Sequence, residues 1–167
     1  GNQAGRVFNV SGSTFTLSGL TIRDGRTTNT AGAGLNTSGT SNLVVTDCRF
    51  TSNMAGGPID GDGDGGGIAL GFGNLLLAGC EFTQNSAGDD GGAVFGSGSG
   101  QVDMSDCIFL QNICDSEGGA VALRDGKRLT AADSTFTSGT AGEYSGFLDN
   151  YGGGQTTLTR CLIAGNY

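Results

Sequence analysis

One acidic stretch of the chain has the residue types and spacing to bind a divalent cation. Carboxylates alternate with glycines in the run Asp60-Gly-Asp62-Gly-Asp64-Gly65. Alternate carboxylates that converge on one point form the first half of a calcium-binding loop of the EF-hand type. The glutamate that such a loop needs at its twelfth position is absent, because Gly71 stands there. An EF-hand is therefore excluded, and other carboxylates would have to complete a Ca²⁺ site.

Carboxylates from a neighbouring turn of the chain are available for this purpose. When the glycine pairs of the sequence are aligned, Asp64, Asp90 and Glu117 fall in one column. Like charges ~4.8 Å apart on adjacent strands repel one another unless they reach water, take up protons or share a cation. The alternative interpretation is a solvated polar loop. The residues predicted to bind Ca²⁺ are Asp60, Asp62, Asp64, Asp89 and Asp90.

Catalysis is a weaker interpretation of the same residues. Glycoside hydrolysis needs two carboxylates that face one groove, and a polysaccharide lyase needs a basic residue beside an acidic cluster. The basic residues Arg124, Lys127 and Arg128 follow a different strand from the acidic corner in the alignment, and the chain has no histidine. We therefore predict no catalytic residues. A lyase or hydrolase is kept as an alternative function, by analogy of fold alone.

A repeated pattern predicts the elements that position these residues. Copies of Cys-x-Phe-x-x-Asn begin at Cys48, Cys80 and Cys107, and weaker copies begin at Ser134 and Cys161. They recur roughly every 27 residues, which is the spacing of a solenoid whose turns are single repeats. Between them lie Gly-Gly-Ala-Val copies and segments in which apolar and polar residues alternate with the period of a strand.

These periods predict an all-β parallel β-solenoid of about five to six coils, with three short strands in each coil. The chain is predicted to be a single domain over residues 1–167, either complete or a segment of a longer solenoid. Inward columns are expected along the axis, with a phenylalanine column beside a cysteine column that starts at Leu20. Asn53, Asn85 and Asn112 are expected to bond coil to coil at a corner. The five cysteines are expected to be free thiols.

Composition agrees with this architecture and limits the partners. The chain has 34 glycines and one proline among 167 residues, which is incompatible with a helical bundle because glycine costs ~1 kcal/mol in a helix interior. The net charge of −8 disfavours nucleic acid and anionic lipid as partners. The apolar runs are too short for membrane insertion.

The repeat resembles a known family. Phe-x-x-Asn ends at Asn53, Asn85 and Asn112, and it is paired with Gly-Gly-Ala-Val beginning at Gly91 and Gly118. This combination resembles the passenger repeats of the polymorphic outer-membrane proteins of chlamydiae. The resemblance implies a right-handed β-helix. It also implies an extracellular or cell-surface location and a role in adhesion or as structure.

The two ends of the repeat series suggest a partner. The strand around Phe8 corresponds to the Gly-Gly-Ala-Val strand of the later coils, and the last coil stops at Tyr167 before that strand recurs. The first strand of one copy could therefore complete the last coil of another copy, or the remainder of a longer chain could do so. The residues predicted for self-association are Val7, Phe8, Val10, Cys161, Ile163 and Tyr167.

We therefore expect a non-catalytic extracellular structural or surface protein that assembles head to tail into a filament. The alternative is an adhesin-type module that binds a glycan or a surface protein along one flat face.

Overall fold

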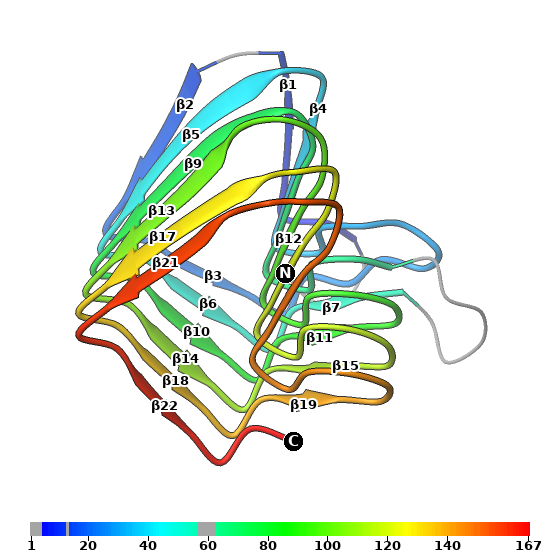
Figure 1. Cartoon of the computed structure of the whole chain (residues 1–167). Coiled ribbons are helices and arrows are strands. Elements are labelled where there is room, and N and C mark those ends of the chain that lie inside the picture. Colours follow the sequence, from blue (N-terminus) through cyan, green and yellow to red (C-terminus); the bar gives the residue numbers. More distant parts are fainter. Residues whose placement is uncertain (1–4, 13, 57–62) are drawn as a thin grey trace.

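The chain folds into a stack of coils built only from short parallel strands (Figure 1). The computed structural model describes residues 5–12, 14–56 and 63–167. Each coil contributes one strand to each of several sheets, and every strand pairs in parallel with its counterpart one coil away. The all-β solenoid predicted from the repeats is confirmed.

Two of the four sheets form one side of the coils. Sheet A comprises β1 (Phe8–Ser11), β4 (Leu35–Ser38), β8 (Ile68–Leu70), β12 (Val94–Gly96), β16 (Val121–Leu123) and β20 (Leu148–Asn150). Sheet B comprises β2 (Thr14–Ser18), β5 (Ser41–Thr46), β9 (Gly73–Ala78), β13 (Gln101–Ser105), β17 (Arg128–Ala132) and β21 (Thr156–Thr159). Six strands per sheet correspond to six coils.

The other two sheets close the coils. Sheet C comprises β3 (Thr21–Arg23), β6 (Arg49–Thr51), β10 (Glu81–Thr83), β14 (Ile108–Leu110), β18 (Thr135–Thr137) and β22 (Leu162–Ala164). Sheet D comprises β7 (Met54–Ala55), β11 (Ser86–Ala87), β15 (Ile113–Cys114) and β19 (Thr140–Ala141).

Sheet D is a fourth strand position that the sequence pattern did not reveal. Its strands are two residues long, so each has a single inward residue, such as Ala87 or Cys114. One inward residue cannot produce a visible alternation of polar and apolar positions. The structure thus extends the predicted three strands per coil to four in the central coils.

Two columns of the core consist of nearly identical side chains stacked along the axis. The rings of Phe50, Phe82, Phe109 and Phe136 are stacked with centroids 4.8 Å apart, the spacing of neighbouring strands. Cys48, Cys80, Cys107 and Ser134 form the predicted column beside them and are buried. All five cysteines are free, as predicted. The expectation for Leu20 was wrong, because its side chain is 42 % exposed on the first coil.

Buried asparagines join the coils at the corner between sheets C and D. The Asn85 side chain accepts hydrogen bonds from the backbone and side-chain amides of Asn53, at 3.2 and 2.9 Å. Its own amide donates to Asn112 and to the Phe50 carbonyl, at 3.0 and 2.9 Å. Both donors and the acceptor of a fully buried amide are satisfied, which is the condition for burying it without a large penalty.

The single lysine of the chain lies inside the corner between sheets A and B. Lys127 is fully buried, and its Nζ donates to the carbonyls of Gly73 and Ser99 at 3.1 and 3.4 Å. Gly96 leaves the space for it, because a Cβ at that position would lie 2.7 Å from Lys127 Cδ. Burial lowers the pKa of Lys127 to about 8.

Candidate functional site

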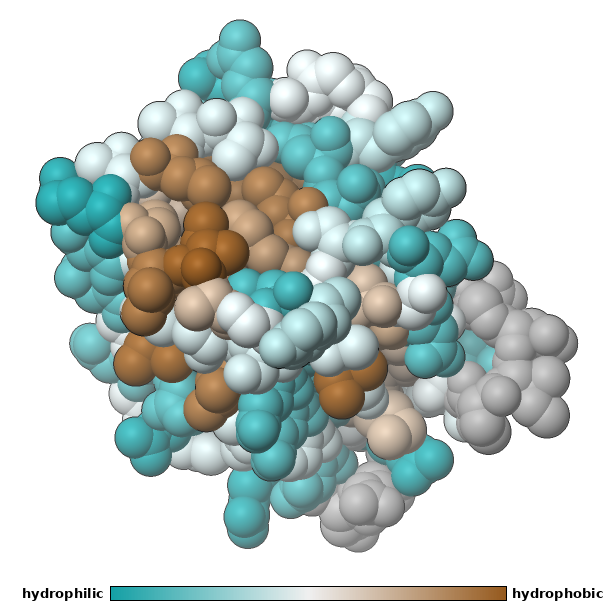
Figure 2. All heavy atoms as spheres, turned by 60° about the horizontal axis from the view of Figure 1, so that its bottom comes forward, coloured by the Kyte–Doolittle hydropathy of each residue, from teal (hydrophilic) through white to brown (hydrophobic). Residues whose placement is uncertain are grey.

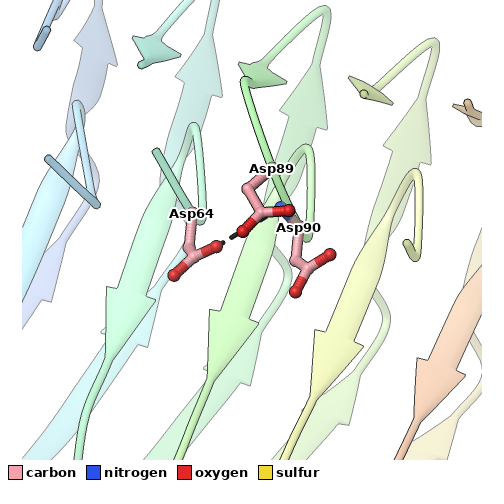
Figure 3. Close-up of side chains that lie close together, drawn as sticks. All are labelled: Asp64, Asp89 and Asp90. Carbon is pink, nitrogen blue, oxygen red and sulfur yellow. Dashed lines mark hydrogen bonds between the residues drawn. The ribbon is translucent and has the colours of Figure 1, made fainter. Parts of the chain in front are cut away.

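Acidic residues gather where the chain passes from sheet D to sheet A. Carboxylate oxygens of Asp64, Asp89 and Asp90 lie within 4.8 Å of one another. Asp64 belongs to one coil, and Asp89 and Asp90 belong to the next (Figure 3). The backbone amide of Asp90 donates to Asp64 at 3.3 Å. The predicted proximity of these three residues is confirmed, whereas Asp60 and Asp62 lie outside the described residues.

The environment of this corner disfavours negative charge. The pKa of Asp64 is raised to about 6, first by burial and then by the neighbouring carboxylates of Asp89 and Asp90, against the lowering effects of the Asp90 backbone hydrogen bond and of Arg124. Asp64 is therefore partly protonated near neutral pH. The unfavourable environment follows directly from stacking acidic residues at the same position of successive coils.

A basic residue that the sequence placed elsewhere neutralises part of this corner. Arg124 follows β16, and its guanidinium donates from Nε to Asp90 Oδ2 at 2.8 Å and makes a second, shorter contact with the same oxygen. It also donates to Glu117 at 3.0 Å. The Asp90 side chain is only 2 % exposed, so this is a largely desolvated ion pair. Arg124 does follow a different strand from the acidic corner, as the alignment predicted, but its side chain reaches that corner.

The reason is the length of the arginine side chain. Sheet A lies between the acidic corner and the segment that carries Arg124, but the strands of sheet A are only three residues long in the central coils. A guanidinium at one end of such a strand reaches the opposite end along the outer face. Alignment of backbone positions could not show this contact.

A second acidic contact was not predicted. The pKa of Glu117 is raised by burial and then by the neighbouring Asp149 carboxyl group. Asp149 lies in β20, and its Oδ2 is buried without a hydrogen-bond partner. The register of sheet A pairs Asp149 with Ala122, so no acidic column points to it in the sequence.

The two end coils of the stack differ in how well they cover the core. At the first coil Val10 is buried, and Val7 and Phe8 are partly buried against the core. At the last coil Ile163 is 44 % exposed and Tyr167 is 79 % exposed.

Apolar side chains gather on the face that lies at the bottom of Figure 1, as Figure 2 shows. We call the open end of the stack, formed by β20, β21, β22 and Tyr167, the C-terminal face. Cys161 packs there against the core and is partly exposed. Leu158 and Leu162 are 38 % and 56 % exposed on the same coil.

All three tyrosines of the chain lie on this last coil, and each is strongly exposed. Tyr144 and Tyr151 flank β20, and Tyr167 pairs with the outer end of sheet D through its backbone bond to Gly139. Tyrosine is enriched at protein interfaces, where it contributes large contact area at low cost in side-chain entropy.

Comparison with known proteins identifies the family. The chain matches the family described as right-handed β-helix region over residues 2–167. It belongs to this family. Neither curated proteins nor solved structures gave a significant match. The narrower resemblance to chlamydial passenger repeats stays a prediction.

Three described carboxylates of this β-helix could contribute to a cation site. Ca²⁺ takes six to eight oxygen ligands. Asp64, Asp89 and Asp90 supply fewer, and Arg124 already binds Asp90. A calcium site here would therefore need oxygens beyond these three, and the Ca²⁺ hypothesis stays a prediction.

A groove on the outside of the β-helix is separate from the acidic corner. It lies on sheet C and is lined by Thr21, Arg23, Arg49, Phe50, Thr51, Glu81 and Thr83. Its Arg49 and Glu81 side chains pair at 3.0 Å. None of these residues belongs to the corner that holds Asp64 and Arg124. The described residues contain no helix long and apolar enough to cross a bilayer.

Proposed function

We propose that this β-helix is a non-catalytic structural protein of an extracellular or cell-surface assembly, in which copies stack end to end into a filament. One observation carries the proposal: the C-terminal face exposes residues whose partners in the preceding coil are buried. Phe136 is fully buried, whereas Ile163, its partner in sheet C, is 44 % exposed. Ala131 is fully buried, whereas its partner Leu158 is 38 % exposed.

The first coil of a second copy has the side chains to cover this face. Continuing the registers of sheets A, B and C by one coil places Phe8 over Leu148, Leu17 over Leu158, and Ile22 over Ile163. Leu17 and Ile22 are already buried within their own copy, so the apolar surface that the first coil offers comes from Phe8, Phe15 and Leu20. The edge strands would pair in parallel, as all strands of the stack do. Strand addition of this kind supplies affinity through backbone hydrogen bonds, and the apolar columns supply burial.

Charge favours a second copy at this position. The described part of the first coil, residues 5–31, has three arginines and one aspartate, a net charge of +2. The last coil, residues 143–167, has two acidic residues and one arginine, a net charge of −1. Opposite local charges on the two ends favour a head-to-tail encounter between molecules that otherwise repel, since each copy carries −8.

Such a contact joins different surfaces of two identical chains. A heterologous contact whose rotation does not close a ring produces an open filament. The resemblance to chlamydial passenger repeats supports the extracellular or surface location, and the grooves of the outer faces support no specific reaction.

The test is sedimentation velocity of the 167-residue chain over a wide concentration range, beside an Ile163→Lys variant. We expect concentration-dependent growth of the wild type and a monomeric variant, because the lysine would be buried without a partner in the stack. A wild type that stays monomeric throughout contradicts end-to-end assembly. It would instead favour coverage of the face by a further coil of a longer chain.

A second candidate function is glycan binding as an adhesin. The sheet C groove favours it, because Arg49, Thr51 and Thr83, whose side chains carry hydrogen-bond donors, line this groove. Binding to a glycan array by a chain that forms no polymers would support this alternative, and its disappearance in a Thr83→Val variant would assign it to the groove.

A further inference from the structure

One column of residues in sheet A points away from the core, and it has a polar residue at each end of the stack. Asn9 lies on the first edge strand of the sheet, β1, and Asp149 lies on the last edge strand, β20. The whole column runs Asn9, Asn36, Ala69, Phe95, Ala122, Asp149. If copies stack as proposed above, on which this inference rests, Asp149 of one copy faces Asn9 of the next.

The hydrogen bonds of this column have a fixed direction. The Asn36 side-chain amide donates to Asn9 Oδ1 at 3.0 Å. On sheet B the same arrangement recurs, because the Asn74 amide donates to Asn42 Oδ1 at 3.0 Å. In both pairs the amide of the later coil donates to the oxygen of the earlier coil. Within the described residues Asn9 accepts through its side-chain oxygen, and by the same direction its amide nitrogen would donate to a coil stacked on β1.

Asp149 offers the matching acceptor at the other end. Its side chain is partly exposed on β20, and its Oδ2 is buried without a hydrogen-bond partner. Its carboxyl group lies against Glu117, whose pKa it helps to raise. Continuing the register of sheet A places this partly exposed carboxyl group opposite the Asn9 side chain of a second copy.

We propose that Asn9 of one copy donates a hydrogen bond from its side-chain amide to the Asp149 carboxylate of the preceding copy, and that this contact sets the polarity and register of the stack. A contact between two C-terminal faces would instead bring two copies of Asp149 together. A slip of one residue would turn the apolar columns of sheet A outward, since successive strand residues face opposite sides. The Asn9–Asp149 contact is satisfied only in the head-to-tail register that also aligns the apolar columns.

An exchange of the two side chains tests this contact. Asn9→Asp keeps the oxygen that accepts from Asn36 but places a carboxylate against Asp149. We expect it to raise the concentration needed for assembly at least tenfold. Asp149→Asn keeps an acceptor oxygen and should assemble like the wild type. The double variant Asn9→Asp/Asp149→Asn restores a donor opposite an acceptor, so it should recover assembly.

Asn42→Asp is the matched control. Asn42 accepts from Asn74 as Asn9 accepts from Asn36, but it lies in an inner coil, on β5. It should leave assembly unchanged, and thermal unfolding of each variant checks that the monomer is intact. Equal assembly of Asn9→Asp and wild type, or failure of the double variant to recover, overturns the inference while leaving the proposed function in place. A wild type that never assembles overturns both.

Discussion

Arg124 donates two hydrogen bonds to one carboxylate oxygen of Asp90, a residue 34 positions earlier in the chain. The pair spans the outer face of sheet A and joins two neighbouring coils. Because Asp90 is nearly inaccessible to water, the guanidinium is what allows a charged carboxylate at this corner. The acidic residues that first suggested cation binding are thus held together partly by a cation of the protein itself.

Removal of this arginine should destabilise the fold. Arg124→Gln leaves Asp90 buried without its charged partner, and we expect a loss of about 3 kcal/mol in the free energy of unfolding in urea. Arg49→Gln is the control, because Arg49 pairs with Glu81 on the exposed face of sheet C and should cost less than about 1 kcal/mol. Equal losses in the two variants would show that burial of the pair is unimportant.

Stability should increase in mild acid because of Asp64. The pKa of this carboxyl group is about 6 in the folded chain and near 3.8 in the unfolded chain. Between these values the folded state binds more protons, so its stability rises as the pH falls from 7 through 6 and levels off below about 4. Asp64→Asn keeps the oxygen that accepts from the Asp90 amide and should reduce this rise. The melting temperatures of both proteins at pH 7.5 and pH 5 measure the difference.

Because of Lys127, the stability of the fold should rise with pH in the alkaline range. The pKa of Lys127 is about 8 in the folded chain and near 10.5 in the unfolded chain, so the unfolded state binds more protons between these values. Stability therefore rises with pH through this window. Lys127→Met fills the same space without a charge and should lack the rise. Since both proteins contain the same cysteines, the difference between their curves isolates the lysine, and parallel curves would contradict the assignment.

The asparagine column should contribute more to stability than exposed asparagines do. Asn85→Ala removes four hydrogen bonds and leaves the amide groups of Asn53 and the Phe50 carbonyl without their partner. We expect a loss of at least about 3 kcal/mol in the free energy of unfolding, since each buried group without a partner costs about 1–3 kcal/mol. Asn74→Ala, on the exposed face of sheet B, should change stability by less than about 1 kcal/mol.

The sequence was sufficient to predict the solenoid and its inner columns. Phenylalanine and asparagine recur at the positions of Phe82 and Asn85 in every central repeat. Identical side chains can repeat in this way only if the coils stack in register. Sheet D was not predictable, because Ala87 is the single inward residue of its strand.

The contacts of the candidate site were only partly predictable. Asp64 and Asp90 share a column, so their proximity follows from the repeat. The contacts of Arg124 and Asp149 depend on where long or partly buried side chains point across the outer face of sheet A. No periodic pattern encodes that direction.

Electron microscopy of the assembled chain tests the central claim most directly. Head-to-tail stacking of six coils in one continuous β-helix predicts unbranched filaments with a rise of about 29 Å per copy along the axis, from a strand spacing of ~4.8 Å. Ile163→Lys should form none. Particles that remain single at all concentrations, or filaments whose repeat contains two copies in opposite orientations, would contradict it.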